Sequence, residues 1–169
     1  MVFVVSLALL VMAGMRGLTL VAFGWWSAVG TALMFVDLAV RRLPARLCYL
    51  AASGLGVLLL GQAVASDAFE PWLRLMLGGL GSAAVVALCS LAFPVAVRWG
   101  DVRFALAVGG AAAWSGWLAL YAMALLATGG TAAVGIGLVA ARRASRKTHL
   151  PQGPFWYAAA LVAVSVIGV

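Results

Sequence analysis

The sequence predicts an all-α protein, a polytopic transmembrane bundle of about six to seven helices. Hydrophobic residues make up 66% of the 169 residues and charged residues only 9%, whereas a soluble domain is about half apolar and about a quarter charged. The mean hydropathy is +1.16. A soluble fold of this length exposes too much surface to hide so many apolar side chains. Lipid is therefore the expected solvent, with roughly 20 apolar residues for each helical crossing.

Four apolar runs fill the first part of the chain, and the segments between them are typical helix ends. Arg16-Gly17 ends the first run, which lacks the basic start and cleavage site of a signal peptide and is expected to be retained. Arg41-Arg42-Leu43-Pro44 ends the second, because the residue before proline is disfavoured in a helix. The polar segment Ser66–Arg74 separates the last two. The predicted spans are Val2–Met15, Leu18–Val40, Leu47–Ala65 and Leu75–Val97.

The second part of the chain predicts three further helices. Val102–Ala141 contains no charged residue except Arg103 and is long enough for two compact crossings. Ser115-Gly116 and Gly129-Gly130 are alternative breaks between them, and the pattern does not choose. A basic loop and a Pro/Gly segment then precede the last predicted span. These are Arg142–Lys147, Leu150–Pro154 and Phe155–Val169.

The basic residues predict the orientation. If Val102–Ala141 crosses twice, nine of the 11 Lys and Arg residues fall on one face, leaving Arg16 and Arg74 for the other. Basic loops mark the cytoplasmic side, so Asp37 and Asp101 are expected there. The net charge of +7 comes from these clusters beside the spans, which argues against nucleic acid as a partner and for contact with membrane lipid.

Neither a metal nor a cofactor site is indicated. Cys48 and Cys89 lie far apart within or beside apolar runs, and His149 has no neighbouring ligand residues. Short loops leave no room for a separate soluble domain. Any chemistry is therefore expected at the helix ends or in the connections.

Two of the four acidic residues stand out. Asp67 and Glu70 fall in the polar segment beside Arg74, where solvated charge needs no explanation. Asp37 lies within an apolar helix and Asp101 between two apolar runs, and a carboxylate at membrane depth is costly and predicts function. Each also has a structural interpretation. Asp37 has Arg41 at the favourable i,i+4 spacing, and Asp101 could cap a helix beginning at Val102.

Three segments resemble the signatures of the type IV prepilin peptidases, in the same order. Asp37–Leu47 resembles the first, an aspartate followed by a basic segment and an Ile-Pro-Asn-like turn. Arg98–Arg103 resembles the second, Gly-x-Gly-Asp-Val-Lys. Leu150–Phe155 resembles the Ile-Pro-Phe-Gly-Pro-Phe segment near the family's C-terminus. The likeness covers Leu18–Val169, as a single peptidase-like transmembrane domain, and leaves residues 1–17 as an extra N-terminal span.

The resemblance implies an aspartic endopeptidase that removes the leader of prepilin or pseudopilin substrates at the cytoplasmic face of the inner membrane, without a cofactor. It also implies the short form, lacking the N-terminal methyltransferase region and N-methylation activity. Asp37 and Asp101 would be the catalytic pair. The residues implied for the substrate and active-site loops are Pro44, Gly100, Arg103, Gly153 and Pro154.

Three positions depart from the family's pattern, and they leave a second hypothesis open. Ala45 replaces an asparagine, Arg98 the first glycine of the Gly-x-Gly-Asp motif, and Gln152 an apolar or aromatic residue. The alternative is a catalytically inactive scaffold of a pilus or secretion system. A transporter is disfavoured, because its ionisable groups usually lie near the bilayer midplane. A homo-oligomer stays open.

Overall fold

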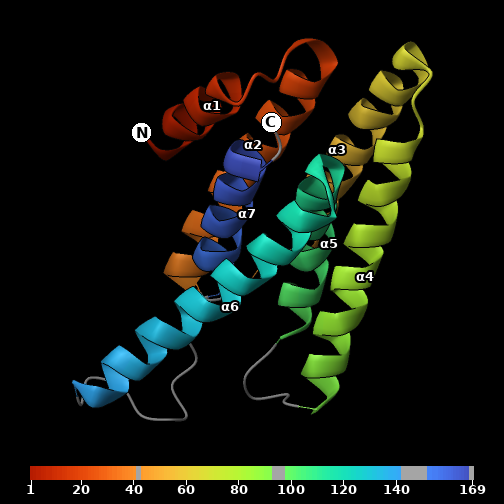
Figure 1. Ribbon diagram of the computed structural model, residues 1–169. Helices are drawn as coiled ribbons and strands as arrows, with labels where there is room; N and C mark the ends of the chain where they lie inside the picture. Colours follow the sequence, from red (N-terminus) through yellow and green to blue (C-terminus); the bar gives the residue numbers. More distant parts are fainter. Residues whose placement is uncertain (41–42, 93–97, 142–151, 168–169) are drawn as a thin grey trace.

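The computed structural model describes residues 1–40, 43–92, 98–141 and 152–167 (Figure 1). These residues form seven helices and no strand, which confirms the predicted all-α fold. In chain order the helices are α1 (Val2–Met12), α2 (Gly17–Val40), α3 (Ala45–Ser66), α4 (Glu70–Ala92), α5 (Trp99–Ser115), α6 (Trp117–Ala140) and α7 (Gly153–Ile167).

Four of these helices are long and apolar enough to cross a membrane. They are α2, α3, α4 and α6, with 22 to 24 residues each, or about 33 to 36 Å of helix against a hydrocarbon core of about 30 Å. Large apolar side chains such as Leu88, Leu125 and Ile136 are mostly exposed on the outside of the bundle. This surface suits lipid, and the chain is a membrane protein, as its composition predicts.

The first helix is shorter than the predicted span Val2–Met15. It ends at Met12 because Gly14 and Gly17 take positive φ values of +74° and +58°, a conformation open mainly to glycine. Its 11 residues extend over about 17 Å, which is too short to cross a bilayer. It packs against α2 and α7 instead.

The remaining boundaries settle one open alternative and correct two. The break in Val102–Ala141 is at Gly116, whose φ of +136° favours glycine, and Gly129-Gly130 lies inside α6. The fourth helix begins at Glu70, not after Arg74. Proline is tolerated in the first turn of a helix, because the N–H that it lacks would have no helical partner there, so Pro71 does not prevent this earlier start. The fifth begins at Trp99, three residues before the predicted start.

Helix α5 lies at the centre of the bundle and contacts α3, α4, α6 and α7. Ten of its 17 residues are buried. Its closest neighbour is α4, and glycines make the approach possible. A Cβ atom on Gly79 would lie 2.8 Å from the carbonyl oxygen of Leu106. Small residues at such a crossing let backbones pack closely where both helices are surrounded by lipid.

The helix directions bring distant segments to the same end of the bundle. The end of α2 and the starts of α5 and α7 lie together (Figure 1). We call this the site end. The turns between α1 and α2, α3 and α4, and α5 and α6 form the opposite end. Helix α6 crosses the bundle obliquely, and its last turns extend away from the other helices.

Candidate active site

Asp37 lies one turn before the end of α2, and its side chain is only 5% exposed. Its Oδ2 atom accepts a hydrogen bond of 2.9 Å from the backbone N–H of Gly153, the first residue of α7. The N-terminal N–H groups of a helix have no helical partners and interact favourably with negative charge. The start of α7 therefore holds the carboxylate of α2 in place.

The close approach of the two helices requires glycine at position 153. A Cβ atom there would lie 2.8 Å from Oδ2 of Asp37 and 3.3 Å from its Cβ and Cγ. Pro154 follows in the first turn of α7, where its missing N–H has no helical partner to lose. The Gly-Pro pair thus starts the helix and leaves room for the carboxylate.

Asp101 is the third residue of α5 and is 9% exposed. Its Oδ2 accepts a hydrogen bond of 2.9 Å from the backbone N–H of Arg98, the residue that precedes the helix. A carboxylate at this position satisfies an N–H group at the helix start. The prediction that Asp101 is the N-cap of a helix beginning at Val102 is therefore wrong: Arg98 is the N-cap, and Asp101 accepts from its N–H at the third position of the helix.

Gly100 seats this first turn on the connection between α2 and α3. A Cβ atom on Gly100 would lie 3.2 Å from Cβ of Leu43, which is itself buried. Pro44 follows as the exposed N-cap of α3, with φ −65° and ψ 125°. Of the two predicted loop residues, Gly100 thus makes the contact with Leu43, and Pro44 follows Leu43 directly in the chain.

Both carboxylates belong to the site end, Asp37 near the end of α2 and Asp101 near the start of α5. Cys48, in the first turn of α3, is buried at the same end of the bundle. The structure therefore brings Asp37, Asp101, Gly153, Gly100 and Arg103 to the same end of the bundle, although they come from different helices.

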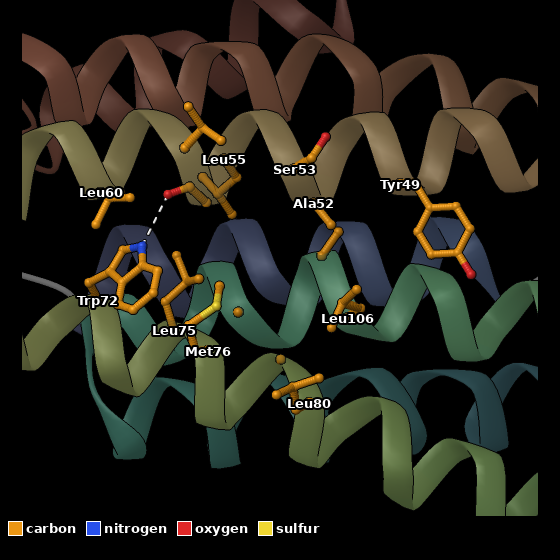
Figure 2. Close-up of a pocket in the computed structure, with 15 residues that line it drawn as sticks. Tyr49, Ala52, Ser53, Leu55, Leu60, Trp72, Leu75, Met76, Leu80 and Leu106 are labelled. Atoms are coloured by element: carbon orange, nitrogen blue, oxygen red, sulfur yellow. Dashed lines mark hydrogen bonds between the residues drawn. The ribbon is translucent and has the colours of Figure 1, made fainter.

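An apolar groove begins beside this cluster. It lies between α3 and α4, with α5 at its base, and its volume is about 420 Å³ (Figure 2). Tyr49 stands at the site end, where its ring lies 6.0 Å from the guanidinium carbon of Arg103. At the opposite end, Trp72 donates a hydrogen bond of 3.1 Å to the carbonyl oxygen of Gly56. The groove thus runs along the helices from the site.

The structure explains how arginine fits at the first glycine position of the motif. Arg98 has φ −105° and ψ 156°, a region that any L-residue adopts. Arg98 is exposed, and its backbone N–H donates to the carboxylate of Asp101. The close packing falls at Gly100 instead, where glycine is present.

Several expectations fall on residues outside the described part of the chain. Arg41 is one, so the alternative ion pair with Asp37 is not described. The others include the basic segment Arg142–Lys147, His149 and Leu150-Pro151, and residues 93–97 and 168–169, with which the predicted fourth and last spans end. Within the described residues, no group of three or more His, Cys, Asp or Glu side chains is placed to hold a metal ion.

Sequence reasoning missed a buried polar cluster around Tyr157. Its hydroxyl lies 2.9 Å from Oγ of Ser27, 3.1 Å from Oγ1 of Thr31 and 3.2 Å from Oγ of Ser6. It also donates to the carbonyl oxygen of Ser27 at 3.0 Å. A Cβ on Gly30 would lie 2.5 Å from the Tyr157 ring. The cluster fixes α7 against α1 and α2, and so places the start of α7 at Asp37.

Comparisons of the chain with protein-family models, with curated proteins and with solved structures give no match.

Proposed function

We propose that this chain is an aspartic endopeptidase of the prepilin peptidase type, acting at the cytoplasmic rim of the inner membrane. One observation carries the proposal. Asp37 and Asp101 are both buried and lie at the same end of the bundle, although they come from different helices. A buried carboxylate at membrane depth costs free energy, so its presence indicates a functional role.

Hydrolysis of a peptide bond uses such a pair directly. One carboxylate removes a proton from water, and the resulting oxygen attacks the carbonyl carbon. The other group, protonated, donates a hydrogen bond to the carbonyl oxygen, and the leaving amine takes up a proton as the C–N bond breaks. When two carboxyl groups lie close together, repulsion between the two negative charges disfavours ionisation of both, so the pair shares one proton.

The apolar groove suits the expected substrate. A prepilin leader is followed by a hydrophobic helix, and the groove between α3 and α4 offers an apolar seat of about 420 Å³ that begins at Tyr49 and Arg103. Arg103 is two residues from Asp101. A substrate helix in the groove would therefore present its leader end to the two aspartates.

The alternative is a non-catalytic scaffold, and one observation favours it. Each carboxylate already accepts a backbone hydrogen bond, Asp37 from Gly153 and Asp101 from Arg98. A pair that only joined the helices would make the same contacts. On this alternative the aspartates stabilise the site end and cleave nothing.

Co-expression with a prepilin separates the two hypotheses. A peptidase removes the leader, which is seen as a mobility shift, and Asp37→Asn or Asp101→Asn abolishes removal. Asp67→Asn is the matched control, because Asp67 is an exposed acid at the opposite end of the bundle. A scaffold leaves the leader intact even with the unaltered chain, and its assembly role survives both substitutions in the site.

A further inference from the structure

The opposite end of the bundle holds a pocket that the peptidase hypothesis does not use. Its volume is about 370 Å³, and two arginines from distant parts of the chain line it. Arg16 comes from the turn between α1 and α2, and Arg74 from the second turn of α4. Thr19, Trp114 and Ser115 line it as well. The pocket is thus built by the turn between α1 and α2, the start of α2, the second turn of α4 and the end of α5.

The charge of this pocket is positive. Asp67 and Glu70 are the acids of this end, and neither lines it. Glu70 accepts a hydrogen bond from Nη1 of Arg74, but its own side chain is 79% exposed, away from the interior. Within the described residues, Arg16 forms no ion pair. Among the described residues, the guanidinium of Arg16 therefore has no acidic partner, and that of Arg74 pairs with an acid through Nη1 alone.

Arg74 keeps donors for a ligand. A guanidinium carries five N–H groups. Nη1 donates to Glu70 and Nη2 donates to the carbonyl oxygen of Trp114 at 3.3 Å. Nη1 and Nη2 each keep a second N–H group, whereas Nε is buried and has no partner within the described residues. The contact with Trp114 fixes the guanidinium against the end of α5, and such a pre-oriented arginine is suited to oxyanions.

We infer that this pocket binds a phosphate group, held between Arg16 and Arg74. Arginine binds phosphate through paired, charge-assisted hydrogen bonds. The pocket lies at the ends of membrane-crossing helices, at the depth where lipid headgroups are expected. Arg16 and Arg74 are the two basic residues that the sequence predicts on this face, opposite the basic loops. The phosphate could belong to an anionic phospholipid or be inorganic phosphate. The inference stands independently of the peptidase function.

Two probes distinguish the sources. The purified full chain in detergent is titrated with phosphatidylglycerol and followed by native mass spectrometry, and inorganic phosphate is titrated separately by calorimetry. Arg16→Gln and the double variant Arg16→Gln/Arg74→Gln remove the charges. Arg46→Gln is the control, since Arg46 is exposed at the site end. Arg16 makes no hydrogen bond or ion pair within the described residues, so Arg16→Gln tests binding without threatening the fold.

The unaltered chain and Arg46→Gln should bind one phosphatidylglycerol alike, and each arginine lost should weaken binding about tenfold. Glu70→Gln should strengthen it, because the negative charge that competes with phosphate for Arg74 is removed. If inorganic phosphate alone shows this dependence, the site stands and takes free phosphate. The inference is overturned if neither ligand responds to the double variant, or if Arg46→Gln weakens binding equally.

Discussion

The backbone N–H of Gly153 donates a hydrogen bond of 2.9 Å to Oδ2 of Asp37, so that the start of α7 holds a buried carboxylate near the end of α2. Both residues were candidates from the sequence, for separate reasons. Their contact gives the glycine a specific task, because a Cβ atom would lie 2.8 Å from the carboxylate oxygen.

Gly153→Ala should displace Asp37 or the start of α7. We expect a loss of roughly 1–3 kcal/mol in stability from overpacking, and a loss of leader cleavage well beyond what the stability change explains. Thermal unfolding in detergent and the cleavage assay measure the two effects. Gly61→Ala is the control, since a Cβ there meets nothing within 4 Å. Equal behaviour of the two variants would contradict the assigned contact.

Tyr157→Phe should destabilise the packing of α7 on α1 and α2. The substitution removes the hydroxyl that Ser6, Ser27 and Thr31 share, at a cost of about 1–2 kcal/mol within a membrane bundle. Tyr121→Phe should cost nothing, because Tyr121 is 64% exposed on α6. Unfolding by denaturing detergent compares them, and a stable Tyr157→Phe variant would refute the role of the cluster.

The crossing of α4 and α5 should be intolerant of a single methyl group. Gly79→Ala places a Cβ 2.8 Å from the carbonyl oxygen of Leu106, a backbone atom that cannot move aside cheaply. The expected loss is roughly 1–3 kcal/mol. Gly81→Ala on the same helix meets nothing within 4 Å and should be neutral or slightly stabilising. The midpoint of thermal unfolding decides between them.

Filling the apolar groove should impair substrate binding more than chemistry. Ala52→Trp places a bulky ring between α3 and α4 (Figure 2), so KM for a prepilin should rise severalfold while kcat changes little. Ala84→Trp adds the same bulk to an exposed position of α4 outside the groove. A groove that takes no part in substrate binding would leave KM unchanged in both variants.

Composition, together with the glycine, proline and charged residues between the apolar runs, predicted the all-α fold. The apolar runs and the positions of glycine and proline predicted where most helices lie, because backbone stiffness and lipid solvation act locally. The ends were less predictable. The predicted span Val2–Met15 ends earlier, at Met12, because glycines with positive φ follow it. Pro71, which the pattern placed in a loop, lies in the first turn of a helix.

The candidate site divides in the same way. The cost of an acid in an apolar run could be read at Asp37 and Asp101, because that cost depends on neighbours in the chain. Their partners could not, because the contacts of Asp37 with Gly153 and of Gly100 with Leu43 depend on how helices cross. Tyr157 was missed for the same reason. A serine or threonine within a span reveals no partner until another helix supplies one.

The rate of leader cleavage by the purified chain, measured for Asp37→Asn, Asp101→Asn and the double variant, tests the central claim most directly. Two groups that act as one unit give non-additive losses. Each single variant should therefore lose at least about a thousandfold in kcat, and the double variant should lose no more than the worse single one. A double variant that still removes the leader at an appreciable rate would contradict the account.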